Sequence, residues 1–452
     1  MTKNILLKNA KLFKANDDSL IDDGTILIEG NIIRYSGPTK DFKNDSTNFV
    51  PVDLNGQFVM PGMTESHAHL SYSNNGPTEL EKTPVEEAML NSMDNARIML
   101  GSGFTSAIGF GSVHRIDVFL RDAIKNGQIP GPRLKASGRD LGSTGSNADL
   151  TPDYARPDVD GLGMFCDGPY EVRRGVRSMA KNRVDVVKIF LDGECMCDHA
   201  QPGQLTYTDE EVAAAVDEAH KRNMKVATHS RSAAAVKQAV IHGVDYIGHA
   251  NYLDEEALDL LKKNKDRVFV GPAIAWELKF MEDPSCLGFT PTQKQIDAYA
   301  KEVEATVSSV KKMKSVGVRV LVGGDYGLNV TPHGTYAKDL EYFVRIFGMT
   351  PSEALLCATR DGGAAFDSSG MLGTLEEGKL ADLLVVNGNP LEDITVLQDH
   401  DRLTAVIKDG IVYQNLVGKS PYVQTDFAKL SEEAKTLTRK TSKEKPFLEK
   451  VI

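Results

Sequence analysis

Short apolar runs separated by polar turns occupy both ends of the sequence, within residues 1–58 and 380–415. Such runs, bounded by turn residues such as Gly and Asn, predict β-strands. The runs are residues 5–7, 24–28, 32–33, 381–387 and 405–413. Neither end is long enough to bury a good core alone. We therefore expect the two ends to pair into one small β-sandwich domain that is split in the sequence.

Between these ends, residues 59–379 alternate strand-like runs with helix-like stretches, which is typical of a parallel sheet. The clearest helix spans residues 208–222, where Thr208 and Glu211 start it in near capping-box fashion. Eight strand-like runs can be counted, at residues 58–67, 105–109, 133–137, 184–190, 225–229, 246–249, 268–272 and 318–325. Eight βα units predict an α/β fold, and they favour a closed (β/α)8 TIM barrel over an open sheet.

The last segment, residues 416–452, is a polar tail rich in Lys, Glu and Thr. Leu430, Ala434 and Leu437 could form one weak apolar helix face. A docking arm and a frayed end are equally compatible with this pattern.

Composition excludes some classes of protein. The 452 residues carry a formal net charge of -11, which argues against a nucleic-acid partner because phosphate binding needs clustered Lys and Arg. The five cysteines are scattered, as expected in a reducing compartment. We see no signal peptide, and no apolar run approaches the ~20 residues of a membrane span. These features predict a cytoplasmic protein without a membrane partner.

Two histidines stand close together in His67-Ala68-His69, which ends the first strand of the predicted barrel. Side chains two residues apart on a strand end point the same way, so both imidazoles could bind one metal ion. A pair of ordinary loop histidines is the alternative. The position favours a metal site, because barrel active sites lie at the carboxyl ends of the strands.

Lys188 lies inside an apolar run, Val-Val-Lys-Ile-Phe. An unpaired buried ammonium is costly, so this lysine either reaches out of the strand, pairs with an acid or loses its charge. A neutral amine can react with carbon dioxide to give a carbamate. Because a carbamate is a bidentate anion that could bridge two cations, we expect one on Lys188.

Three further strand-like runs end in His229, His249 and Asp325. Each residue alone could be a core histidine or a capping aspartate, but all fall where a barrel places its active site. The expected arrangement is His67, His69 and Asp325 on one divalent ion, His229 and His249 on a second, and Lys188 between them. A hydroxide between two ions is a strong nucleophile, and Asp325 could pass its proton to the leaving group. Zinc is the expected ion, with cobalt or manganese as alternatives.

The ordered set of these residues resembles the ligand set of the amidohydrolase superfamily. The surrounding sequence resembles its imidazolonepropionase-like and Xaa-Pro dipeptidase-like branch. The matching stretches are residues 186–189, 208–211, 219–229, 243–249 and 373–383. The resemblance covers nearly the whole chain up to about residue 415. It implies the barrel, the split β-sandwich, the same ligand positions and a homo-oligomer.

Three residues are candidate substrate contacts. Asn147 stands where members of this branch often carry a histidine, in a segment that reads Thr-Gly-Ser-Asn. An amide can donate a hydrogen bond but carries no charge, so it would hold a substrate carboxylate less well. Arg231 could bind a carboxylate bidentately, with a surface salt bridge as the alternative. His333 follows Asp325 on the last βα loop and is the third candidate.

Together these features predict a hydrolase that cleaves a C–N bond in a small-molecule amide, carbamate or urea. Dipeptidase-like cleavage of N-acyl amino acids is an alternative, as are esterase, lactonase and phosphotriesterase activities, because the same hydroxide attacks those centres. The deaminases of the superfamily typically have a glutamate soon after the third ligand histidine, whereas Ser-Arg-Ser follows His229 here. A non-catalytic scaffold that kept the fold would be expected to have lost ligands, and all six are present. A metal-binding protein without turnover is the remaining alternative.

Overall fold

The computed structural model describes residues 4–43, 49–149, 151–152, 161–197, 199–282, 290–414, 416–417 and 423–424. The chain divides into two compact units. The first comprises Met1–Met63, Leu100–Thr105 and Pro351–Ile452, and the second comprises Thr64–Met99 and Ser106–Thr350. Almost all of the predicted tail lies outside the described residues. In the described part of the chain, no helix combines the length and apolar character needed to cross a bilayer.

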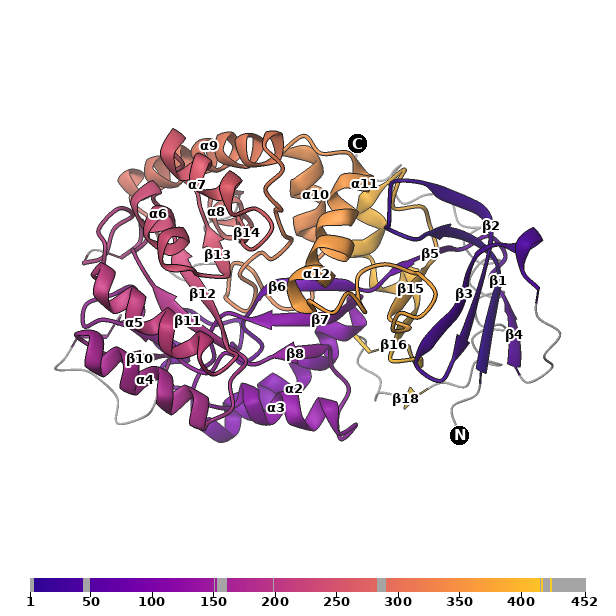
Figure 1. Ribbon diagram of the computed structural model, residues 1–452, viewed down its shortest axis with the longest axis horizontal. Helices are drawn as coiled ribbons and strands as arrows, with labels where there is room; N and C mark the ends of the chain where they lie inside the picture. The colour runs from indigo at the N-terminus through magenta and orange to yellow at the C-terminus, as the bar shows by residue number, and fades with distance from the viewer. Residues whose placement is uncertain are drawn as a thin grey trace. The chain divides into compact units, whose positions relative to one another are not determined.

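One sheet of the first unit contains strands from both ends of the sequence (Figure 1). Its strands are β1 (Asn4–Phe13), β2 (Leu20–Glu29), β3 (Ile32–Pro38), β4 (Phe49–Asp53), β5 (Phe58–Pro61), β15 (Leu383–Val386), β16 (Leu403–Lys408), β17 (Ile411–Gln414) and β18 (Val423–Gln424). They are hydrogen-bonded in the order β18-β17-β16-β15-β5-β1-β2-β3, and β4 pairs with β1. The antiparallel β5–β15 pair joins the two ends of the sequence. Strands from both ends of the sequence thus lie in one sheet, and the β-sandwich remains a prediction.

The core of this unit follows the two-residue period of its strands. Alternate residues point to the same face of a sheet, and here one such set is buried. Its members include Ile5, Leu7, Ile26, Ile28, Leu383, Val385, Ala405 and Ile407. The remaining elements are η1 (Thr39–Asp41), α11 (Pro351–Leu356), η4 (Cys357–Asp361), α12 (Gly362–Phe366), η5 (Ile394–Gln398) and η6 (His400–Arg402).

The second unit alternates strands and helices. Its strands are β6 (Met63–Ala68), β7 (Phe104–Gly109), β8 (Arg133–Lys135), β9 (Asp140–Gly142), β10 (Gly163–Phe165), β11 (Val186–Phe190), β12 (Lys225–Ser230), β13 (Tyr246–His249) and β14 (Phe269–Gly271). Its helices are α1 (Pro77–Leu80), α2 (Val85–Gly101), α3 (Asp117–Lys125), α4 (Pro169–Lys181), α5 (Asp209–His220), α6 (Ala233–His242), α7 (Glu255–Lys263), α8 (Ala275–Glu282), α9 (Gln293–Ser315) and α10 (Lys338–Arg345). The strands form the hydrogen-bonded series β6-β7-β8 and β10-β9-β11-β12-β13-β14.

The predicted strand at residues 318–325 is the exception, because it forms isolated bridges and no continuous strand. Val320 bridges Val270 and Tyr326 bridges Ala68, both in parallel, so this segment lies between β14 and β6. A Cβ atom on Gly323 would lie 2.8 Å from the His67 nitrogen, so only glycine allows this close approach. The φ of 59° at Asp325 then turns the backbone out of the extended form.

Local sequence explains how the helices beside the site strands begin. Thr208 caps α5 in a capping box with Glu211, which confirms the helix start expected from the sequence. Ser232 caps α6, which follows directly after β12 and ends at Gly243 in the left-handed region. Helices α5 and α6 both pack against β12. The strand that carries His229 is therefore held by capped helices.

Candidate active site

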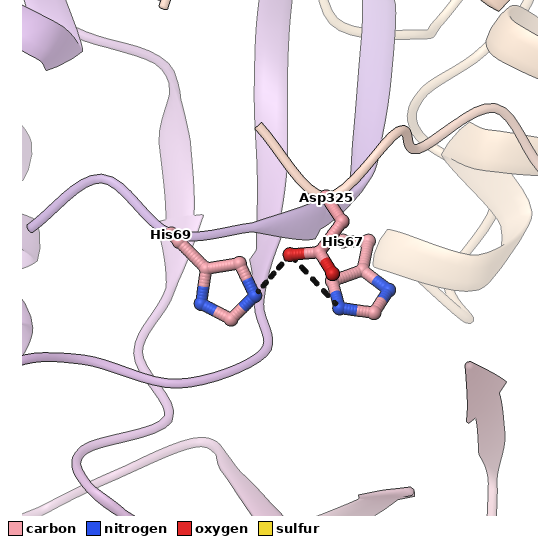
Figure 2. A group of neighbouring side chains, drawn as sticks. All are labelled: His67, His69 and Asp325. Carbon is pink, nitrogen blue, oxygen red and sulfur yellow. Dashed lines mark ion pairs between the residues drawn. The ribbon is translucent and has the colours of Figure 1, made fainter. Parts of the chain in front are cut away.

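His67, His69 and Asp325 meet at the carboxyl end of β6 (Figure 2). Asp325 Oδ1 lies 3.0 Å from His69 Nε2 and 3.7 Å from His67 Nε2. The parallel bridge between Ala68 and Tyr326 brings the two segments together. The three candidate ligand atoms lie within 4.8 Å of one another, as the sequence predicted for one ion.

The hydrogen bonding of His69 leaves its second ring nitrogen directed at Asp325. His69 Nδ1 lies 3.1 Å from the Gly111 carbonyl oxygen, which can only accept, so Nδ1 carries the proton of a neutral ring. The Nε2 lone pair then faces Asp325 Oδ1 at 3.0 Å, and two acceptors repel unless a cation or a proton lies between them. Two imidazoles and a carboxylate in this arrangement fit a divalent metal ion.

Charge in this group is set by burial and by its neighbours. Burial lowers the pKa of His67 well below its usual value, so the ring stays neutral and available as a ligand. Burial opposes ionisation of Asp325, but positive charge at Lys188, and at His67 and His69 when their rings are protonated, holds the pKa of its carboxyl below the ordinary value. The aspartate is therefore an anion at neutral pH.

His229 and His249 form a second pair of facing ring nitrogens. Nδ1 of His229 lies 3.0 Å from Nε2 of His249, and both rings are buried. Burial lowers the pKa of each well below its usual value. Nε2 of His229 lies 3.4 Å from the Gly193 carbonyl and 3.3 Å from Arg231 Nε, which favour opposite tautomers. A cation between the two rings requires the tautomer that donates to Gly193.

Lys188 is 1% exposed on β11, so it does not reach out of the strand. Its Nζ lies 4.6 Å from the centre of the Phe110 ring and 5.0 Å from that of Phe190. Burial lowers its pKa to about 8, although Asp140 and Asp325 act in the opposite direction. At pH 7 roughly a tenth of the amine is therefore uncharged, and carbamate formation draws on this fraction.

Two of the predicted ligands have strained backbones. His249 has φ of 81° and Asp325 has φ of 59°, in the left-handed region that side chains other than glycine rarely adopt. Each such residue costs on the order of 1 kcal/mol, and such strain is found mainly at functional sites. The backbone thus turns at the two positions where it must aim a ligand inward.

A cavity of about 540 Å³ opens onto these residues. Five of the six predicted ligands line it, namely His67, His69, Lys188, His229 and Asp325. An apolar wall completes it, formed by Leu80, Leu162, Phe190, Trp276 and Leu328. Asn147 lines the cavity, whereas Arg231 and His333 do not. Only one of the three predicted substrate contacts therefore faces this space directly.

Arg231 is buried in a group of carboxylates. Its guanidinium donates to Glu277 at 2.5 Å, to Glu194 at 3.1 Å and also to Glu302. The Arg231 side chain is 1% exposed, which is at odds with the surface salt bridge considered from the sequence. With its donors engaged by three acids, it is poorly placed to bind a substrate carboxylate. Its contacts tie together α8, α9 and the loop after β11.

His333 is held by two hydrogen bonds away from the cavity. Its Nδ1 lies 2.6 Å from the Tyr336 hydroxyl, and its Nε2 lies 2.9 Å from the Tyr72 carbonyl oxygen. A neutral ring satisfies both contacts, and burial lowers its pKa to about 4. Tyr72 stacks on His69 with ring centres 4.3 Å apart, so His333 supports the site indirectly.

Sequence reasoning missed three acidic residues of the site. Glu65 is fully buried and accepts a hydrogen bond from the His67 backbone nitrogen at 3.0 Å. Asp140 and Glu194 line the cavity. Burial raises the pKa of Asp140 to about 7. Glu65 lies two residues before the candidate ligand His67, and this spacing is a usable signal. The single acids Asp140 and Glu194 have no such signal in the sequence.

A larger hollow of about 1020 Å³ lies elsewhere on the second unit. Val85, Phe119 and Arg115 are among its lining residues, and none of the predicted metal ligands lines it. We therefore locate the site by its chemistry and not by the size of the hollow.

Comparison with known proteins gives a consistent result. The amidohydrolase family matches residues 58–412. Ochratoxinase of Aspergillus niger is 27% identical over 443 residues, covering 90% of this chain and 86% of that protein. Imidazolonepropionase of Rhizobium rhizogenes is 19% identical over 414 residues, covering 84% of this chain and 90% of that protein. A crystal structure of a Xaa-Pro dipeptidase with bound methionine in the active site has a TM-score of 0.79 and 30% identity, covering 91% of this chain and 100% of that chain.

Proposed function

Because the chain belongs to the amidohydrolase family, and is therefore an enzyme, we propose that it is a metal-dependent hydrolase of small-molecule C–N bonds. The bond cleaved would be that of an amide, a carbamate or a urea. One observation carries the proposal: two imidazoles and a carboxylate converge within 4.8 Å beside a cavity large enough for a small organic molecule.

The proposed metal centre uses the donors described above. The proposed assignment is His67, His69 and Asp325 for one divalent ion, His229 and His249 for a second, and the carbamate of Lys188 between them. Bound ions would supply an activated water and polarise the scissile carbonyl. Zinc is the proposed ion, and cobalt or manganese suits the same donors.

Asp325 is the proposed proton carrier. Its carboxylate is an anion, because the neighbouring histidines and Lys188 hold its pKa low. It can accept the proton of the attacking water and deliver it to the leaving nitrogen. Trp276 and Leu328 on the apolar wall exclude bulk water, which strengthens electrostatic interactions inside the cavity.

Charge in the cavity supports substrates without a carboxylate. Lys188 is the one lysine or arginine among the described residues that line it, and the proposed bridge uses that side chain. Arg231 is engaged by three glutamates, and Asn147 is uncharged. The similarity to a Xaa-Pro dipeptidase keeps dipeptidase-like cleavage as the second candidate.

The family implies a TIM barrel, and we propose that the parallel segments of the second unit form a closed barrel of eight strands. The supporting contacts are the bridges of residues 320 and 326 to β14 and β6, and the Val186 nitrogen donating to the Ala136 carbonyl at 3.1 Å. The sandwich of the two chain ends, homo-oligomerisation and a cytoplasmic location remain predictions from the sequence.

The test is hydrolysis by the metal-loaded enzyme across one panel of compounds. The panel holds N-acyl amino acids and Xaa-Pro dipeptides, aryl carbamates, ureas and anilides without a carboxylate, a lactone and a phosphotriester. We expect preference for the carbamates, ureas or anilides. Preference for the carboxylate-bearing amides would support the dipeptidase candidate, and activity on the lactone or phosphotriester alone would contradict C–N hydrolysis.

A further inference from the structure

Asp140 is a buried carboxylate that the proposed chemistry does not use. It opens β9, is 3% exposed and lines the cavity. Its Oδ1 atom has no hydrogen-bond partner among the described residues. A buried carboxylate oxygen without a partner is costly and rare, so this atom needs a partner that the described residues do not supply.

The backbone around Asp140 is built to hold this carboxylate in place. A Cβ atom on Gly111 would lie 2.3 Å from Asp140 Oδ1, so only glycine lets the chain pass this close. Gly111 has φ of 139°, a conformation that favours glycine. Its carbonyl oxygen is the partner of His69 Nδ1, at 3.1 Å. The carboxylate is thus packed beside the metal-binding group, with one oxygen unpaired.

The charges of the cavity indicate what Asp140 could receive. Asp325 and Lys188 belong to the proposed metal centre, which leaves Glu79, Asp140 and Glu194 as the other charged side chains among the described lining residues. Arg231, which donates to His229 Nε2, already pairs with three glutamates. The unpaired oxygen therefore complements a cation or a nitrogen-bound hydrogen that arrives with the substrate.

The apolar wall restricts the remainder of that substrate. Leu80, Leu162, Trp276 and Leu328 line the same cavity and belong to one buried cluster. A branched aliphatic or aromatic group would bury its surface there. A small molecule with a basic nitrogen and an apolar group could then contact Asp140 with the one and the apolar wall with the other.

We propose that Asp140 binds the protonated amino group of the substrate, so that the enzyme acts on small amides that carry a basic nitrogen beside an apolar group and lack a carboxylate. This rests on the proposed function for the bond that is cleaved. It concerns recognition only, and Asp140 is a specificity-determining residue with no part in the bond cleavage.

The test uses a pair of ligands that cannot be hydrolysed. Leucinol carries an amino group and a branched apolar chain, and 4-methylpentan-1-ol lacks only the amino group. Their binding to the metal-loaded protein is measured by calorimetry. We expect the wild type to bind leucinol at least about tenfold more tightly, as befits a charge-assisted hydrogen bond in a buried site.

Substitution separates Asp140 from other causes. D140N should remove most of this preference, with the affinity for 4-methylpentan-1-ol and the metal content unchanged. D149N, on the loop that follows, is the matched control because Asp149 does not line the cavity, and it should keep the preference. D140S serves as a second variant if D140N does not fold.

Three results would overturn the proposal. The first is equal binding of the two ligands by the wild type. The second is a preference for leucinol that survives in D140N, which would place the amine on the metal ions. The third is loss of metal from D140N. The binding measurement needs no turnover. If the enzyme hydrolysed nothing in the panel but kept the Asp140-dependent preference, the proposed function would fail and the amine site would stand.

Discussion

Arg231 donates to Glu277 over 2.5 Å, and their side chains are 1% and 0% exposed. Glu302, also 0% exposed, and Glu194 share the same guanidinium. Burial raises the pKa of Glu277 well above its usual value, and Arg231 opposes this effect. One arginine thus stabilises acids from α8, α9 and the cavity wall, and its role is to position these elements.

Removing Arg231 should therefore destabilise the protein strongly. Arg231→Met leaves buried carboxylates without their cation, and we expect a loss of about 3–5 kcal/mol in the free energy of unfolding. The measurement is urea denaturation at neutral pH. Arg34→Met is the control, since the Arg34–Glu29 pair is exposed at 52% and 42% and should contribute no more than about 1 kcal/mol. Equal effects of the two substitutions would show that the buried group is not held by Arg231.

Lys188→Ala should lower the metal content. Without the bridging carbamate the two proposed ions lose a shared ligand, so the variant should hold one ion or none per chain and lose at least about a hundredfold in activity. Metal analysis after dialysis checks this, and a short-chain carboxylic acid should restore part of the activity. Full metal content and full activity in Lys188→Ala without added acid would show that no carbamate of Lys188 bridges the ions.

Asp325→Asn should affect turnover far more than substrate binding. The amide keeps the shape of the side chain but cannot accept a proton, so kcat should fall by about 10²–10⁴ with a small change in KM. Because Asp325 is also a proposed ligand, the metal content of the variant must be measured in parallel. Unchanged turnover at full metal content would exclude Asp325 as the base.

His333 should make the metal-free protein sensitive to acid. Its pKa is about 4 in the folded chain against 6.5 for a free histidine, so between these values the unfolded chain binds more protons. The contribution of His333 to the free energy of unfolding is complete above pH 6.5 and is lost as the pH falls toward 4. The difference between the two pKa values corresponds to about 3 kcal/mol. Urea unfolding at pH 7.5 and 5 should show a smaller loss for His333→Gln than for the wild type, and equal losses would contradict this.

The sequence could single out the candidate metal ligands because they obey a rule of position. A polar residue that ends an apolar strand, as at His229 and His249, is visible in the pattern itself. The partners of Arg231 were not visible, because Glu302 lies 71 residues away in a helix whose register against β12 no local pattern specifies. Asp140 was missed for a related reason, since its strand is three residues long.

The break in the predicted strand at residues 318–325 has the same origin. The segment from Val318 to Val322 has the composition of a buried strand. Nothing in that composition indicates that its backbone forms isolated β-bridges and no continuous strand. In this segment Gly323 approaches His67 closely, a tertiary contact between segments far apart in the sequence that no local pattern shows. Propensity is a weak guide wherever such contacts decide the backbone.

The β5–β15 pair has a consequence for synthesis on the ribosome. Phe58–Pro61 pairs with β1 on one side, but its other edge must wait for Leu383–Val386. At roughly 5–20 residues per second, the intervening stretch takes on the order of tens of seconds to emerge. Throughout that interval the edge of β5 is open to any neighbouring chain. Slow translation or crowded polysomes should therefore favour misassembly at this edge before the enzyme is complete.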